Sequence, residues 1–168
     1  EPGSSWHYGT SADVLGAVIE AVSGMRFGQF LEKELFGPLG MKDTAFYVPQ
    51  EKQDRLAAVY EAVSQKGRNT LVRFEKDHLG VRNRMEKAPG FESGGAGLAS
   101  TLDDYMRFAR MLLCGGELEG VRILRPATVA YLTGGELTQE PQRAFGRWNG
   151  LEGFSYGNLM RVCKKPGC

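Results

Sequence analysis

The chain has 168 residues, which is enough for one domain with a substantial core and too few for two comfortable ones. Its hydrophobic share of 42% and charged share of 24% are ordinary for a folded globular protein and argue against intrinsic disorder. The 21 Lys and Arg residues are interleaved with 20 Asp and Glu residues, giving a formal net charge of +1. This pattern favours neither nucleic acid nor an anionic membrane as a partner.

The first predicted helix follows an aromatic segment that contains Trp6 and Tyr8. Thr10 and Asp13 have the spacing of a capping box, and Ser23-Gly24 marks the end of the helix. Between these limits, apolar residues recur on one helical face, which we expect to be buried: Val14, Leu15, Val18, Ile19 and Val22. The sequence therefore predicts a helix near residues 11–23, with Tyr8 presented at its mouth.

A second helix is predicted over residues 27–35, with Gly37-Pro38 ending it. Its buried side is expected to consist of Phe27, Phe30, Leu31 and Leu35. Residues 55–62 and 70–76 then have short, partly alternating patterns that are typical of strands, and the turn residues 65–69 between them favour a hairpin. The polar, basic segment 81–89 is predicted to be a loop.

The second half of the chain opens with a predicted helix over residues 101–113. Thr101 is its expected N-cap, acidic residues occupy its first turn, and its buried face is expected to comprise Tyr105, Phe108, Met111 and Leu112. A turn through residues 117–120, a strand at 121–124 and a helix from Pro126 to Leu132 should follow. Alternation over Phe154 to Val162 predicts one final strand, and we expect the helices to pack as one layer.

The three cysteines, Cys114, Cys163 and Cys168, match no common zinc-ligand spacing, so we predict neither a metal site nor a cofactor. No apolar run approaches the length of a membrane span. Unpaired cysteines are more typical of a reducing compartment, but cytoplasmic and exported locations both stay open. Because the chain starts at Glu1 without Met, we interpret it as a piece of a longer protein. The sheet partners of its last predicted strand are then expected to be missing, which would leave a sheet edge open to self-association.

Four sequence blocks together resemble the serine β-lactamase and penicillin-binding family. They are Pro-Gly-x-x-x-x-Tyr at residues 2–8, Phe-Gly-Pro-Leu-Gly-Met at 36–41, Gly-Gly-Ala-Gly-Leu-Ala-Ser-Thr at 94–101 and Ile-Leu-Arg-Pro at 123–126. The resemblance is greatest to the branch of class C β-lactamases, D-alanyl-D-alanine carboxypeptidases and esterases. It implies an α+β, β-lactamase/transpeptidase-like fold, of which residues 1–168 form one partial domain that is mostly the helical part with a few strands.

The resemblance also implies acyl transfer by a serine in a Ser-x-x-Lys motif, with a tyrosine that moves protons and a third Lys-Thr-Gly or His-x-Gly motif. No serine of this chain has Lys three places later, and no Lys-Thr-Gly occurs. His7-Tyr8-Gly9 and His78-Leu79-Gly80 fit His-x-Gly but precede the second glycine-rich block, so we interpret both as coincidence. We expect the nucleophile upstream, the third motif downstream, and no activity in the 168 residues alone.

Tyr8 is the catalytic residue that the resemblance implies; the structural alternative is a half-buried aromatic packed beside Trp6. Thr10 stands where lactam-processing members often have Asn, which favours an ester or peptide substrate over a lactam, although Thr10 is equally suited to be a helix cap. Trp6 could line a substrate groove or seal the core. Gly95 could lie near the acyl-enzyme cleft, or its loop could simply pack tightly under a helix.

Two classes of function therefore stay open. The first is a serine hydrolase that forms an acyl-enzyme on an ester, peptide or lactam carbonyl of a small-molecule or peptide substrate. The second is a non-catalytic penicillin-binding-like sensor or scaffold module that keeps only the fold. A Ser-x-x-Lys motif in the residues preceding Glu1 would distinguish the first class from the second.

Overall fold

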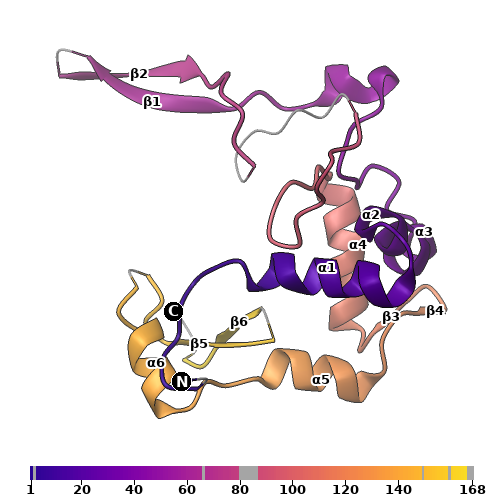
Figure 1. Cartoon of the computed structure of the whole chain (residues 1–168), viewed down its shortest axis with the longest axis vertical. Coiled ribbons are helices and arrows are strands. Elements are labelled where there is room, and N and C mark those ends of the chain that lie inside the picture. The colour runs from indigo at the N-terminus through magenta and orange to yellow at the C-terminus, as the bar shows by residue number, and fades with distance from the viewer. Residues whose placement is uncertain (2, 66, 80–86, 149, 159, 166–168) are drawn as a thin grey trace. The chain divides into compact units, whose positions relative to one another are not determined.

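The computed structural model describes residues 1, 3–65, 67–79, 87–148, 150–158 and 160–165. These residues form two compact units, of which one spans Asp13–Met106 and the other combines Glu1–Ala12 with Arg107–Cys168. Figure 1 gives the order of the elements along the chain. Within the described ranges, no single helix is long and apolar enough to cross a membrane, although Ser11–Ser23 and Phe27–Leu39, bent by 76°, meet the same criterion as a pair.

The first helix, α1 (Ser11–Ser23), has the predicted bounds but not the predicted buried face. Its only fully buried residue is Gly16, where an added Cβ would lie 3.6 Å from the backbone of Gly94 and from the ring of Phe27. A rotation of about 100° per residue places Gly16 opposite Val14 and Val18. The valine side of the helix is consequently exposed, at Val14, Leu15, Val18 and Val22.

The second helical segment runs further than the predicted 27–35. It comprises α2 (Phe27–Leu31), the π-helical turn η1 (Glu32–Phe36) and α3 (Gly37–Leu39), so Gly37-Pro38 does not end it. Pro38 lies in the first turn of α3, directly after the π-helical turn. The segment ends instead at Gly40, whose φ of 68° is left-handed, and the Met41 amide donates to the Phe36 carbonyl over 2.8 Å.

The core of this unit gathers the apolar side chains of that helical segment and of the residues after it: Phe27, Phe36, Leu39, Met41 and Phe46. The 3₁₀ helix η2 (Gln50–Arg55) follows, and then the predicted hairpin, shifted to β1 (Tyr60–Gln65) and β2 (Arg68–Arg73). The strands are antiparallel, with Tyr60 opposite Arg73, and β2 is exposed along its whole length. Most of the predicted loop 81–89 lies outside the described residues.

Helix α4 (Leu102–Leu113) confirms the predicted helix and its cap, because the Asp104 amide donates to the Thr101 hydroxyl over 3.2 Å. Met111 is fully buried as expected, whereas Tyr105 is exposed and the prediction for it was wrong. The buried position in that turn belongs to Asp104 instead. Its carboxylate accepts hydrogen bonds from the Asp43 amide (2.7 Å) and the Thr44 hydroxyl (2.8 Å), which makes its burial possible.

The next elements confirm a strand and a helix and shift their bounds. Strands β3 (Glu117–Leu118) and β4 (Val121–Arg122) pair across Glu119-Gly120, both of which have left-handed φ values of 51° and 84°. Helix α5 (Pro126–Gly134) begins at Pro126 as predicted. The expectation of one helical layer stays a prediction, because α1 and α5 belong to different units.

The C-terminal segment differs from the prediction of one strand over 154–162. It is a hairpin of β5 (Phe154–Gly157) and β6 (Met160–Cys163), which turns at Asn158 with a left-handed φ of 51°. The two strands are therefore each other's partners, and self-association through a missing partner is unsupported. Helix α6 (Gln139–Phe145) was not predicted. Of the cysteines, Cys114 and Cys163 are free and exposed, and Cys168 lies outside the described residues.

Candidate functional site

Tyr8 lies in the N-terminal segment before α1, and its side chain is 71% exposed. The half-buried position considered from the sequence is therefore wrong, although the ring does contact Trp6, with centroids 6.3 Å apart. The ring also contacts Trp148, with centroids 5.8 Å apart, and most of the side chain stays accessible. The phenol is thus open to a reacting molecule.

Trp6 lies at the centre of five aromatic rings of this unit, which we call the Trp6 cluster: Trp6, Tyr8, Phe145, Trp148 and Tyr156. Trp6 meets Phe145 edge-on at 4.9 Å and 84°, and meets Trp148 edge-on at 5.4 Å and 87°. Tyr156 lies 5.5 Å from Trp6 and 5.8 Å from Phe145. Edge-to-face contacts of this kind are favourable beyond the area that they bury, so the ring of Trp6 is held in one orientation.

The cluster is supported by α6 and the final hairpin. Phe145, the last residue of α6, is 1% exposed, and the turn after it places Trp148 through a 3.1 Å bond from the Trp148 amide to the Phe145 carbonyl. The Gln142 side chain donates to the Phe154 carbonyl over 2.9 Å, which ties α6 to β5. Sequence reasoning selected Trp6 and Tyr8 but missed Trp148 and α6, whose sequence has no helical apolar pattern.

The two tyrosines of the cluster differ in their surroundings. Burial raises the pKa of Tyr156, and the negative charge that Tyr8 would carry when ionised raises it further. Tyr156 therefore ionises less readily than an ordinary tyrosine. Tyr8, in contrast, is largely exposed.

Thr10 is exposed and makes no side-chain hydrogen bond within the described part of the chain. The capping-box pairing with Asp13 is absent there, because the Asp13 carboxylate instead accepts a hydrogen bond from the buried Ser93 hydroxyl. A contact between Thr10 and substrate stays a prediction.

Gly95 belongs to a loop that Ser93 organises from within. The amides of Gly95 and Ala96 each donate to the Ser93 hydroxyl oxygen over 3.1 Å, and the same loop packs against Gly16 of α1 through Gly94. The tight packing of backbone beside a helix is thus present. A substrate contact of Gly95 would have to use its carbonyl or its exposed surface, because its N–H is already bonded.

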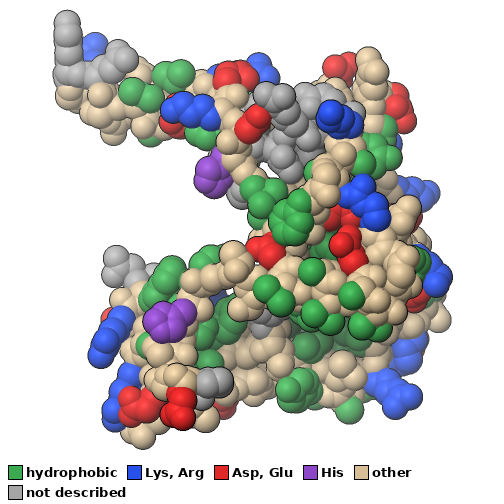
Figure 2. Space-filling view, in the orientation of Figure 1, with side chains coloured by type: hydrophobic (Ala, Val, Ile, Leu, Met, Phe, Trp, Pro, Cys, Tyr) green, Lys and Arg blue, Asp and Glu red, His purple; other side chains and the backbone are tan. Residues whose placement is uncertain are grey.

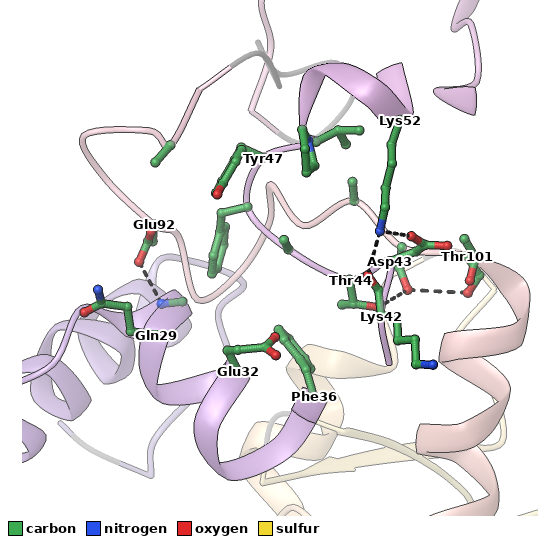
Figure 3. A pocket seen from close by; sticks show the side chains of 18 of the residues that line it. Gln29, Glu32, Phe36, Lys42, Asp43, Thr44, Tyr47, Lys52, Glu92 and Thr101 are labelled. Carbon is green, nitrogen blue, oxygen red and sulfur yellow. Dashed lines mark hydrogen bonds and ion pairs between the residues drawn. The ribbon is translucent and has the colours of Figure 1, made fainter. Parts of the chain in front are cut away.

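Sequence reasoning also missed a cavity of about 650 Å³ in the Asp13–Met106 unit (Figure 3). At one end, Lys52 and Arg55 of η2 reach the Asp43 carboxylate over 2.6 Å and 2.8 Å. The hydrogen bonds from Arg55 and Lys52 lower the pKa of Asp43 to about 2. Phe36 and Phe46, both buried, provide an apolar wall.

At the other end of this cavity, Glu92 accepts a 2.7 Å hydrogen bond from the Gly28 amide and pairs with Arg26 at 3.2 Å. Arg26 also donates to the Pro89 carbonyl over 2.6 Å. Most of the charged groups that line the cavity are thus bonded to one another and hold three segments of the unit together. Among the described residues, no three His, Cys, Asp or Glu side chains are grouped so that they could hold a metal ion.

Residues 1–159 match the Beta-lactamase family model, so the chain belongs to the β-lactamase family, with its mixed α+β, β-lactamase/transpeptidase-like fold. Two relatives in this family are Protein Rv1367c of Mycobacterium tuberculosis, 36% identical over 85% of this chain, and Esterase EstB of Burkholderia gladioli, 28% identical over 98% of it. Among solved structures, "EstCE1, a hydrolase with promiscuous acyltransferase activity" matches 98% of the chain with 27% identity and a TM-score of 0.72.

The chain spans only part of each of these proteins. It covers 34% of Rv1367c, 41% of EstB and 42% of EstCE1. The relatives named as esterases and acyltransferases support a serine hydrolase-like role at the level of the family.

Proposed function

We propose that the whole protein is a serine hydrolase that cleaves esters through an acyl-enzyme, with Tyr8 as the residue that moves the proton. The observation that carries this proposal is the exposed Tyr8 phenol, whose ring contacts the ordered aromatic ring of Trp6. An exposed phenol on a rigid base meets the requirement that an acid–base group be both accessible and oriented. The family and the names of its relatives support this reaction class.

In the proposed reaction, the hydroxyl of a serine in a Ser-x-x-Lys motif attacks the ester carbonyl, and Tyr8, assisted by the lysine, takes up its proton. The bond to the alcohol oxygen then breaks, and Tyr8 returns the proton to that leaving oxygen. Water repeats the sequence on the acyl-enzyme and releases the carboxylic acid. A phenol has an ordinary pKa of about 10, so it needs a neighbouring cation for this role, which the lysine of the motif would supply.

Thr10 supports an ester substrate rather than a lactam. Lactam-processing members often have Asn at this position, and an Asn side chain can both donate to and accept from a substrate amide. The Thr hydroxyl has a shorter reach than the Asn side chain. An ester offers no N–H to be recognised, so it makes no such demand on Thr10.

A second candidate function is acyl transfer to an alcohol in place of water. The name of EstCE1, which describes a hydrolase with acyltransferase activity, favours it. The chemistry of the acyl-enzyme is the same, and only the acceptor differs. Release of carboxylic acid in water, compared with ester exchange in the presence of added methanol, separates the two.

The test uses the full-length protein and its Tyr8→Phe variant, which keeps the ring and deletes only the ionisable oxygen. Acid–base groups of this kind contribute roughly 10²- to 10⁴-fold, so we expect ester hydrolysis to fall by about that factor at an unchanged Tm. Tyr131→Phe removes the hydroxyl of another exposed tyrosine in the same unit and should have no effect. Full activity in Tyr8→Phe would refute the role of Tyr8.

The 168 residues alone are expected to be inactive, because they contain no Ser-x-x-Lys nucleophile. Hydrolysis of a nitrophenyl ester by the purified 168-residue chain, persisting after further purification, would contradict this. If the residues preceding Glu1 also lack Ser-x-x-Lys, the non-catalytic module becomes the better proposal.

A further inference from the structure

The Trp6 cluster presents two exposed rings rather than one. Trp148 is 49% exposed and Tyr8 is 71% exposed, and their centroids are 5.8 Å apart at an interplanar angle of 45°. Tryptophan is usually largely buried, so half of an indole left open beside a candidate catalytic phenol is an unusual arrangement. The two rings together form one aromatic surface that belongs to a single unit of the chain.

The Trp148 ring has a fixed orientation. It stands edge-on to Trp6 at 87°, and Trp6 in turn packs edge-on against Phe145, which is 1% exposed. Backbone hydrogen bonds also hold the chain on both sides of Trp148. The Trp148 amide donates to the Phe145 carbonyl (3.1 Å), and the Leu151 amide donates to the Trp148 carbonyl (3.3 Å). A ring held in this way can stack with a ligand without first losing much conformational freedom.

The proposed reaction decides which part of a substrate reaches Trp148. Tyr8 returns a proton to the leaving oxygen, so that oxygen must come within hydrogen-bond reach, about 3 Å, of the Tyr8 hydroxyl. The alcohol carbon bonded to the leaving oxygen then lies within a few Å of the Tyr8 ring, and the centroid of the Trp148 ring is 5.8 Å from the centroid of that ring. The alcohol part of the ester is therefore within reach of the indole.

We propose that Trp148 determines specificity by stacking with the alcohol part of the substrate, and that the protein prefers esters of alcohols that carry a flat aromatic group. The inference rests on the proposed function of Tyr8 and adds the substrate class and a second residue. Aromatic faces stack favourably with flat apolar groups, whereas a small alkyl alcohol leaves the indole uncovered. Trp148 acts on binding and takes no part in moving the proton.

The experiment compares kcat/KM for two acetates, benzyl acetate and ethyl acetate, with the full-length protein, by continuous titration of the acid released. The acyl group is the same in both, so only the alcohol part differs. In Trp148→Ala we expect kcat/KM for benzyl acetate to fall about tenfold or more, as for the loss of a good apolar contact, and that for ethyl acetate to change less than about twofold. Trp148→Phe keeps an aromatic ring and should retain most of the preference.

Two further measurements test whether the loss of kcat/KM in Trp148→Ala concerns the alcohol part of the ester. Ethyl phenylacetate carries its ring on the acyl side, so Trp148→Ala should leave its kcat/KM nearly unchanged. Tyr131→Ala removes an exposed ring from α5 of the same unit and serves as the matched control. It should not change the ratio of kcat/KM for benzyl acetate to kcat/KM for ethyl acetate. Tm values of all variants show whether each protein is folded.

The outcomes separate the inference from the proposed function. Suppose that the wild-type protein hydrolyses esters but that kcat/KM falls equally for both acetates in Trp148→Ala and in Trp148→Phe. This result overturns the inference and leaves the proposed function standing. A loss confined to ethyl phenylacetate overturns the assignment to the alcohol part. No turnover of any ester by the wild-type protein overturns the proposed function, and the inference with it.

Discussion

Asp43 is the residue whose ionisation most clearly supports the fold of its unit. Its carboxylate holds Lys52 and Arg55 of η2 against the segment that follows α3, and its amide is in turn held by Asp104. The four residues are polar and spread over more than sixty residues of sequence, so no pattern in the sequence predicts that they lie together. The hydrogen bonds of the structure show that they do.

This arrangement predicts a pH dependence of stability. The pKa of Asp43 is about 2 in the folded protein, below the value of about 3.9 expected in the unfolded chain, so the ionised form stabilises the fold above about pH 4. That contribution is lost as the pH falls from about 5 through 2. Urea midpoints of wild type and Asp43→Asn should differ most near pH 6 and converge towards pH 2. A difference that stays constant with pH would contradict the prediction.

A matched control for this measurement is Glu34→Gln. Glu34 pairs at 3.0 Å with Lys33 on the surface, with about half of its side chain exposed. Exposed pairs of this kind contribute little to stability, so the midpoint of this variant should follow the wild type across the pH range.

At the scale of elements, the π-helical turn explains why Gly37 is needed. An added Cβ at Gly37 would lie 2.8 Å from the Glu32 carbonyl oxygen, which is closer than such atoms approach, because the Gly37 amide bonds to that same oxygen. We expect Gly37→Ala to lower the unfolding midpoint in urea. Gly134→Ala, in a helix where nothing lies within 4 Å, should be neutral or stabilising by about 0.5–1 kcal/mol. Equal midpoints for Gly37→Ala and wild type would contradict the clash.

The elements also show which features the sequence could predict. Helices α1, α4 and α5 were predicted within about two residues at each end because their ends carry local signals: Thr10, Thr101 and Pro126 at the starts, and glycine at the ends. The sequence predicts one strand where the structure has a hairpin, because apolar residues recur on both sides of the reversal and only the left-handed Asn158 marks it. Tyr8 was selected from the family motif and Trp6 as its aromatic neighbour in the sequence, whereas Trp148 joins them only through the three-dimensional packing of α6.

At the scale of the whole molecule, the apolar face of α1 is the main discrepancy between pattern and burial. Val14, Val18 and Val22 are 62%, 49% and 83% exposed, and Figure 2 shows hydrophobic side chains at the surface in the region of α1. The chain covers only 34% to 42% of the relatives compared above. We expect this face to be covered in the full-length protein, because contiguous apolar surface of this kind is uncommon on a folded monomer.

The last prediction follows from this exposure. The 168-residue chain should bind a hydrophobic fluorescent dye such as ANS more strongly, mole for mole, than the full-length protein does. The triple variant Val14→Gln, Val18→Gln and Val22→Gln should reduce dye binding to the 168 residues while keeping α1, since Gln has a higher helix propensity than Val. Ala127→Gln changes an exposed alanine of another helix, α5, and should leave dye binding as it is. Equal dye binding by both lengths of the protein would mean that the valine face of α1 is exposed in both.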